Sequence, residues 1–156
     1  MNHVQACVLV PGPLRTVEEG LRRSIRLLCG ETGAAMLTLC APDNDGVCAS
    51  EIRLHLDAAY GSARDRGEML GLSWAPAPDS HYPSFTGTLL IWGLDAQSSW
   101  MGLDGVYSCP GGIPAGASER AREREAALQI AFAVLRCFEG LPAGDAVCRS
   151  GLAVPA

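Results

Sequence analysis

Histidine, cysteine and aspartate are the side chains of this sequence that could carry nucleophilic catalysis. His55 and Asp57 are two residues apart, which puts both on the same side of an extended chain, and Cys48 precedes them. A thiolate beside a histidine that an aspartate orients is the arrangement of a Cys–His–Asp nucleophilic site. Any cysteine-containing sheet offers such a combination, however, and a solvated strand face explains these residues better. The sequence therefore assigns no catalytic residue and predicts a protein that is not an enzyme.

Two segments resemble ligand-binding loops only in part. Asp43–Gly46 begins like a calcium loop, but the EF-hand needs glycine at its sixth position and glutamate at its twelfth, where Cys48 and Leu54 stand. The glycine-rich stretch 110–116 lacks the Gly-Lys-Ser/Thr of a phosphate loop. The seven cysteines contain no C-x-x-C pair, so a zinc cluster is unsupported. We expect no metal and no cofactor.

Composition places the chain among soluble single-domain proteins. Its 156 residues suit one domain. With 12 basic and 17 acidic side chains, the net charge is -5, which argues against nucleic acid as a partner because phosphate binding needs a clustered basic face. The odd number of cysteines, the lack of a signal peptide and the lack of an apolar run long enough to cross a membrane indicate unpaired thiols and a cytoplasmic protein.

The apolar pattern gives the elements that would position any site. Thr16 and Glu19 form a capping box at the start of an amphipathic helix that Gly30 ends. Residues 36–40, 52–57 and 69–74 read as three strands, of which the second alternates clearly between apolar and polar side chains.

The second half of the chain is predicted to contain a connector, a hairpin and a helix. The apolar connector 86–94 favours a short helix, and Asp104–Gly105 is a strong signal for the turn of a hairpin. Residues 118–139 form the last helix, whose apolar surface covers well over half its circumference, so it lies centrally in the core or against a partner chain. The predicted fold is α+β, with an antiparallel five-stranded sheet flanked by an N-terminal and a long C-terminal helix. We expect a flexible leader at 1–13, one domain at 14–141 and a flexible tail at 142–156.

Three segments carry a resemblance to a known family. They are the amphipathic helix 17–28, the segment Leu72–Pro76, and the run Leu89–Trp92 with the following Trp100–Gly105. In the order helix, three strands, connector, hairpin and helix, the chain resembles the CesT-like (class I) type III secretion chaperones. The resemblance covers roughly residues 14–141. It implies a virulence-associated homodimer that binds the extended N-terminal segments of secreted effector proteins, keeps them export-competent and passes them to the secretion ATPase, with no cofactor and no catalysis.

The chaperone hypothesis assigns residues to two surfaces. Surplus apolar surface in an acidic chain favours binding of a partner protein, and an apolar groove could hold an extended segment by strand addition. Six residues are predicted to line or support that groove: Leu21, Ile25, Leu37, Leu39, Ile52 and Leu54. Four residues are predicted to form the dimer interface: Leu90, Ile91, Trp92 and Trp100.

Two other functions stay open. A GAF-like sensory domain also combines terminal helices with a strand such as 32–39, and it would hold a small molecule in an internal cavity. A small enzyme with a cysteine nucleophile would have one thiol far more reactive than the other six.

Overall fold

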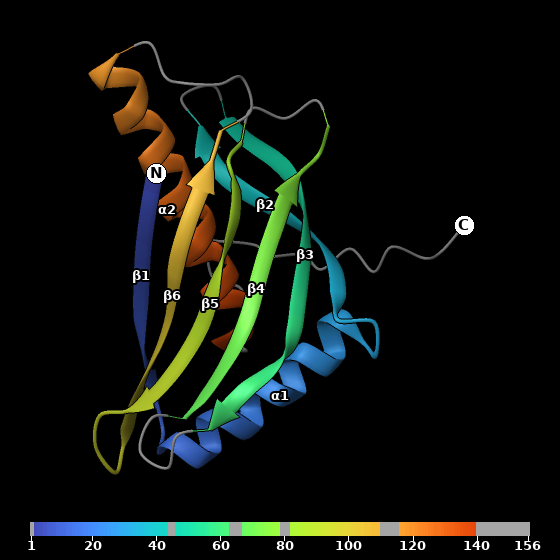
Figure 1. Ribbon diagram of the computed structural model, residues 1–156, viewed down its shortest axis with the longest axis vertical. Helices are drawn as coiled ribbons and strands as arrows, with labels where there is room; N and C mark the ends of the chain where they lie inside the picture. The colour runs from blue at the N-terminus through green and yellow to red at the C-terminus, as the bar shows by residue number, and fades with distance from the viewer. Residues whose placement is uncertain (1, 44–45, 63–66, 79–81, 110–115, 140–156) are drawn as a thin grey trace.

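The structure is a computed structural model that describes residues 2–43, 46–62, 67–78, 82–109 and 116–139 (Figure 1). Within these ranges the side chains of residues 39–43, 46–50, 58–62 and 68 are left out of the description. The elements follow in this order: β1 (Asn2–Pro11), α1 (Leu14–Cys29), β2 (Ala34–Asp43), β3 (Gly46–Ser62), β4 (Glu68–Pro76), β5 (Ser84–Gly93), β6 (Ser98–Ser108) and α2 (Ala117–Glu139).

The strands form one antiparallel sheet in the order β1-β6-β5-β4-β3-β2. The first strand of the chain therefore pairs with the last, and the other neighbours are consecutive. Figure 1 shows α2 running behind the sheet along β1 and β6, while α1 crosses the lower end. The α+β class and the antiparallel sheet are confirmed, although the sheet has six strands instead of five.

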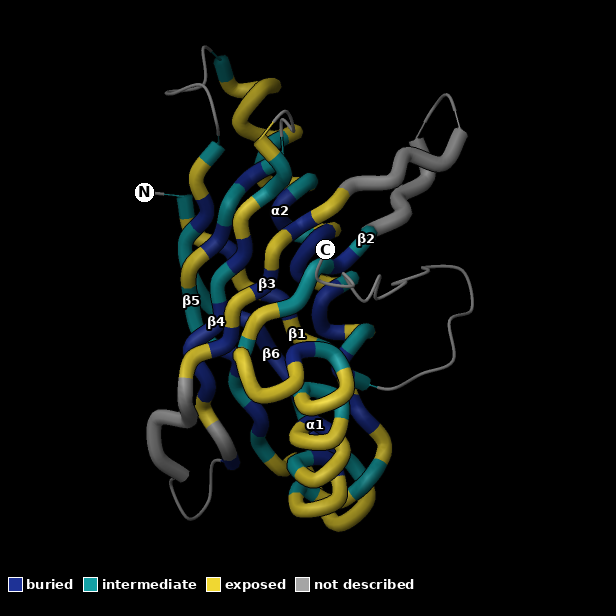
Figure 2. Tube along the Cα trace, turned by 90° about the vertical axis from the view of Figure 1, so that its right-hand side faces the viewer, coloured by how far each residue is buried: buried dark blue, intermediate teal, exposed yellow. Residues whose placement is uncertain are grey.

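The core lies between the inner face of the sheet and α2. Along β3, Ile52 and Leu54 are fully buried, whereas Arg53 and His55, which alternate with them, are exposed, and this confirms the predicted half-buried strand. The side of α2 that faces the sheet buries six residues: Ala127, Ile130, Ala131, Val134, Leu135 and Phe138. The second half of the last helix thus lies in the core, which is one of the two placements that its wide apolar surface predicted, while its first half is largely exposed (Figure 2).

The helix α1 is confirmed, but it starts earlier than its capping signal suggests. It begins at Leu14, after Pro13, and has no side-chain cap hydrogen bond. Thr16 is consequently inside the first turn, where its backbone is helical and cannot serve as an N-cap, so the predicted capping box is wrong. The end is as predicted: Gly30 has a φ of +58° and its N–H bonds the carbonyl of Arg26 at 3.0 Å.

The predicted connector helix at 86–94 is wrong, because most of this segment is strand β5. It pairs with β4 on one side and β6 on the other. Leu89 and Ile91 point into the core, and Leu90 and Trp92 point to the outer face. The consecutive apolar residues arise because this strand has apolar side chains on both of its faces. A short apolar run of this kind does not distinguish a strand from a helix.

The predicted hairpin turn at Asp104–Gly105 is also wrong. Both residues lie inside β6, and Gly105 stands opposite Gly87 of β5. A Cβ on Gly105 would come within 2.5 Å of the Thr86 carbonyl oxygen and 2.7 Å of the Phe85 ring. Glycine is therefore required at this position because β5 and β6 approach each other closely beneath the Phe85 ring. The Asp-Gly sequence reflects this close approach and does not mark a turn.

The turn between β5 and β6 is built instead by residues 94–97. The Oδ1 atom of Asp95 accepts hydrogen bonds from the Gln97 N–H and the Ser98 hydroxyl, both at 2.8 Å. These bonds favour the charged carboxylate and lower the pKa of Asp95.

The expected flexible leader at 1–13 is wrong, because most of it is a strand. Residues 2–11, expected to be a flexible leader, are strand β1, because Val4, Ala6 and Val10 add a buried row to the inner face. The predicted tail 142–156 lies outside the described residues. None of the helices in the described ranges is long and apolar enough to cross a membrane.

Candidate functional site

The residues predicted to line an effector groove are mostly core residues. Leu37, Ile52 and Leu54 have no exposed surface, and Leu21 has 1%. Ile25 is partly buried against them, and Leu39 lies in β2 with its side chain outside the described part. Because these residues pack beneath the helices, the expected open groove is not found on this inner face of the described structure.

The residues predicted to form a dimer interface separate onto two faces. Ile91 is buried with 1% of its surface exposed. Leu90, Trp92 and Trp100 point to the opposite, outer face of the sheet and are partly exposed. Trp92 and Trp100 are cross-strand partners, and their rings stack with centroids 6.4 Å apart.

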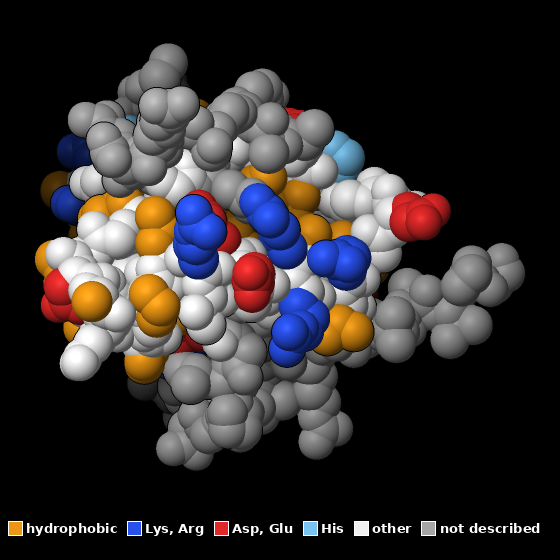
Figure 3. Space-filling view, turned by 90° about the horizontal axis from the view of Figure 1, so that it is seen from below, with side chains coloured by type: hydrophobic (Ala, Val, Ile, Leu, Met, Phe, Trp, Pro, Cys, Tyr) orange, Lys and Arg blue, Asp and Glu red, His pale blue; other side chains and the backbone are white. Residues whose placement is uncertain are grey.

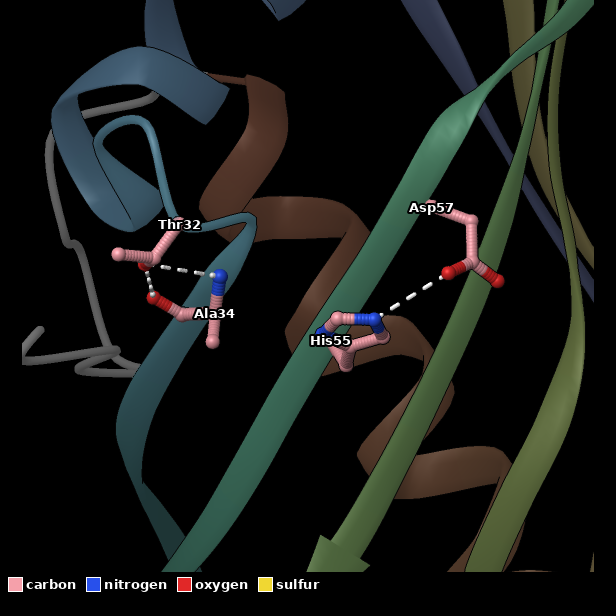
Figure 4. A network of polar contacts seen from close by, with 4 residues as sticks. All are labelled: Thr32, Ala34, His55 and Asp57. Atoms are coloured by element: carbon pink, nitrogen blue, oxygen red, sulfur yellow. Dashed lines mark hydrogen bonds and ion pairs between the residues drawn. The ribbon is translucent and has the colours of Figure 1, made fainter.

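The His55–Asp57 pair lies on the outer face of β3, exposed to solvent (Figure 4). His55 Nε2 is 3.2 Å from Asp57 Oδ1. The neighbouring strand contributes Ala34 opposite His55, and the Thr32 hydroxyl near it bonds the Cys29 carbonyl at 2.9 Å. On the other side, Ser73 of β4 is the cross-strand partner of His55, but no hydrogen bond joins the two side chains among the described contacts, and the side chain of Cys48 is outside the description. The pair is a surface ion pair of small energetic weight.

A different set of polar side chains gathers on the inner side, near the first half of α2. The cross-strand register aligns Trp74, Phe85 and Tyr107 in one row across β4, β5 and β6. Trp74 and Phe85 stack with ring centroids 4.2 Å apart, and the indole N–H donates to the Pro83 carbonyl at 3.0 Å. This aromatic row closes the inner face at the end of the sheet where β6 leads into α2.

Cys109 and Glu123 lie beside that row. Glu123 is one turn before Ala127 on the side of α2 that is buried further along the helix. The thiol of Cys109 hydrogen-bonds the Glu123 carboxylate, and burial together with this carboxylate raises the pKa of Cys109 to about 11. Burial, followed by the charges of Cys109 and Glu123, raises the pKa of Tyr107. We call Tyr107, Cys109 and Glu123 the inner polar cluster.

One oxygen of the inner polar cluster has no partner. Among the described residues, two buried side-chain oxygens lack a hydrogen bond, Asp104 Oδ1 and Glu123 Oε2. Asp104 Oδ1 has the imidazole of His3 2.5 Å away, so this oxygen is compensated by an ion pair when His3 is protonated. Glu123 Oε2 has no such neighbour. A buried carboxylate oxygen without a donor is costly, so this oxygen favours the approach of a hydrogen-bond donor.

The chemistry open to the inner polar cluster is recognition of a hydrogen-bond donor. A thiol with a pKa of about 11 is protonated at neutral pH and is a poor nucleophile, because the thiolate is the reactive form. The phenol of Tyr107 is likewise neutral and can donate or accept. Within the described ranges, no group of three His, Cys, Asp or Glu side chains could hold a metal ion.

Little in the sequence indicates this cluster. The arginines at 122 and 124 on either side of Glu123 are typical of a solvated helix face. Its spacing of four, seven and eleven residues from Ala127, Ile130 and Val134 is the signal that places it on the buried side.

The cysteines differ in their expected reactivity. Cys7, Cys29 and Cys109 are free thiols, and Cys137 is disulfide-bonded, which corrects the expectation that the cysteines are unpaired. Cys7 is exposed, and burial raises the pKa of Cys29.

Cys109 is therefore expected to react with iodoacetamide at pH 8 roughly 100-fold more slowly in the folded protein than after unfolding in denaturant, because a pKa near 11 leaves about a hundredth of the thiolate of an ordinary thiol. Peptide mass spectrometry after timed labelling measures each site separately. Cys109 labelling should accelerate as the pH rises toward 11. If Cys109 were the fastest site at pH 8, it would be an activated nucleophile and this assignment would be wrong.

Comparison with known proteins gives structural neighbours but no matching family. No protein-family model and no curated protein matches the chain. Among solved structures, the chain is similar to the crystal structure of the Zhui aromatase/cyclase from Streptomyces sp. R1128, with a TM-score of 0.47 and 19% sequence identity over 89% of this chain and 92% of that chain.

Proposed function

We propose that this protein is a non-catalytic binding protein for a small, mostly apolar molecule that carries one hydrogen-bond donor group. The observation that supports it best is the unpartnered Oε2 atom of Glu123, which is buried beside Tyr107 and Cys109. A hydroxyl or protonated amine that donates to this oxygen would remove the cost of leaving it unpaired. This function corresponds to the small-molecule alternative considered from the sequence.

The packing of the core limits where such a molecule fits. Leu54, Leu89 and Leu135 have no exposed surface, so no void as large as a water molecule adjoins them. The middle of the space between α2 and the sheet is filled. The binding region is therefore at the first half of α2, where Tyr107 retains 8% exposure. Its wall of aromatic rings suits a flat or chain-like apolar body.

Three related molecules test the proposed donor recognition: 2-phenylethylamine, 2-phenylethanol and 3-phenylpropanoate. They share an apolar ring and differ in carrying a cation, a neutral donor or an anion. Titration calorimetry should show the amine binding most tightly and the carboxylate most weakly, because the carboxylate adds a like charge near Glu123.

Glu123→Gln is the matching variant. It should weaken binding of the amine by at least about tenfold, the effect of losing one hydrogen bond to a charged group. Glu125→Gln is the control, since Glu125 is exposed on the same helix and bonds only Gln129, at 3.3 Å, among the described contacts. Equal binding of the amine by both variants, or tighter binding of the carboxylate, would contradict the proposal.

A second candidate is the type III secretion chaperone. The observation that favours it is the strand order, which leaves the outer edge of β1 without a strand neighbour in the described part of the sheet. Such an edge can take up an extended segment by strand addition. This function also requires the predicted cytoplasmic location and homodimer. Co-expression with the N-terminal segments of secreted proteins, followed by light scattering, tests it. Capture of no segment would argue against it.

A further inference from the structure

The outer face of the sheet carries two adjacent rows of apolar and small residues over its lower part. The register places Leu9, Trp100 and Trp92 side by side on β1, β6 and β5. The next row contains Cys7, Gly102, Leu90 and Met69, on β1, β6, β5 and β4. We call these seven residues the outer apolar face.

The outer apolar face is open to solvent in the single chain. Leu9 has 52% of its surface exposed and Met69 has 37%. The Trp92 ring lies over Gly102, since a Cβ on this glycine would be 3.2 Å from the indole. The Trp92 ring thus packs over the backbone of β6 on the outer face and stacks with Trp100 there, instead of filling the core. A contiguous exposed apolar patch of this kind usually marks an interaction site.

Polar side chains end the patch on its upper side. The row that follows contains Gln5 on β1, Asp104 on β6 and Thr88 on β5. The outer apolar face is therefore bounded and contains no charged side chain. On its other border is the β5–β6 turn, where Leu94 is 55% exposed and is followed by Asp95.

We infer that the occupant of the outer apolar face is a second copy of this chain. In a two-fold symmetric contact each patch meets itself, so a charged residue in it would meet its own charge in the partner copy. The chain carries a net charge of -5, and two copies repel each other over most surfaces. The outer apolar face is free of that repulsion, and it carries two of the tryptophans that are enriched at interface centres.

The shape of this face agrees with that occupant. Two sheets can pack face to face about 10 Å apart with interleaved side chains. The patch runs to the outermost strand β1, so no further strand of the described sheet shields this side. Three residues predicted from the sequence to form a dimer interface, Leu90, Trp92 and Trp100, belong to it, whereas the buried Ile91 does not.

A membrane surface fits the outer apolar face less well. Binding to anionic lipid needs basic residues next to the apolar ones. The exposed arginines of the chain's first helix, Arg15, Arg22, Arg23 and Arg26, lie on α1 at the lower end of the molecule. Figure 3 shows that acidic side chains interrupt the basic ones there, which reduces the attraction for an anionic surface.

Light scattering after gel filtration, over a range of protein concentrations, tests the inference. The expected mass is twice 16.4 kDa. Leu9→Glu places a charge at an exposed position of the outer apolar face and should raise the dissociation constant of the dimer at least 100-fold. Met69→Glu, on another strand of this face, should have the same effect, and it keeps the test valid if the first variant folds poorly. Leu27→Glu is the control, because Leu27 is 73% exposed on α1 and outside the face.

The possible outcomes separate the occupants. A wild-type monomer at all concentrations, or a Leu9→Glu protein that folds and dimerises like the wild type, would overturn the inference. A monomer that cosediments with phosphatidylserine vesicles would identify a lipid surface instead. Small-molecule binding at Glu123 is on the inner side of the sheet, so its failure would leave this result unchanged.

Discussion

Gly105→Ala is expected to destabilise the protein by about 3 kcal/mol. The added Cβ would lie 2.5 Å from the Thr86 carbonyl oxygen and 2.6 Å from the Gly87 Cα, and both are backbone atoms. Because Gly105 is held between β1 and β5, the strands must separate to make room. For a chain of this length the midpoint of thermal unfolding should fall by about 6 to 12 °C, which circular dichroism measures.

Gly20→Ala is the matched control for this experiment, since it makes the same chemical change in a different environment. Gly20 is exposed inside α1, and nothing lies within 4 Å of an added Cβ. Alanine should stabilise the helix by about 0.5 to 1 kcal/mol. If both variants unfolded at the wild-type temperature, the close approach of β5 and β6 at Gly87 and Gly105 would be wrong.

Leu54→Ala is expected to lower the free energy of unfolding by about 2 to 5 kcal/mol, since it removes buried methyl groups and leaves a cavity. Leu54 has no exposed surface and stands next to Trp74 in the cross-strand register. Urea unfolding followed by tryptophan fluorescence measures the change. The same variant distinguishes the two roles considered for this residue, because a surface position in an effector groove would lose binding with little change in stability.

His55→Ala serves as the comparison for Leu54→Ala. It changes the next residue of β3, which is exposed and paired only with Asp57 among the described ion pairs. Its unfolding free energy should stay within about 0.5 kcal/mol of the wild type. An equal loss in both variants would mean that β3 does not alternate between core and solvent as described.

Elements with one buried face could be predicted from the sequence. The alternation over residues 52–57 correctly predicts a strand, and the wide apolar side of α2 correctly predicts a helix. Burial of one side produces a regular spacing of apolar residues that differs between strands and helices. The segment 86–94 and the first strand could not be predicted in this way. β5 has apolar residues on both faces, and β1 finds its partner about a hundred residues later in the chain.

Two residues were placed wrongly by their residue type, because contacts with distant parts of the chain determine their positions. Asp104–Gly105 has the composition of a turn, but Gly105 is there to let two strands approach beneath Phe85. Glu123 has the charge of a surface residue and nevertheless continues the buried side of α2. Neither contact can be deduced without the pairing of β5 with β6 and the packing of α2 on the sheet.

The pairing of β1 with β6 also determines when this chain can complete its fold during synthesis. Asn2 pairs with Tyr107 and Pro11 pairs with Ser98, so β1 leaves the ribosome long before β6, its strand neighbour in the described sheet, exists. At about 5 to 20 residues per second the delay is roughly 5 to 20 s. Throughout that interval Val4, Ala6 and Val10 have no sheet to cover them. During synthesis, residues 2–11 are therefore open to aggregation and to capture by chaperones until β6 has been made.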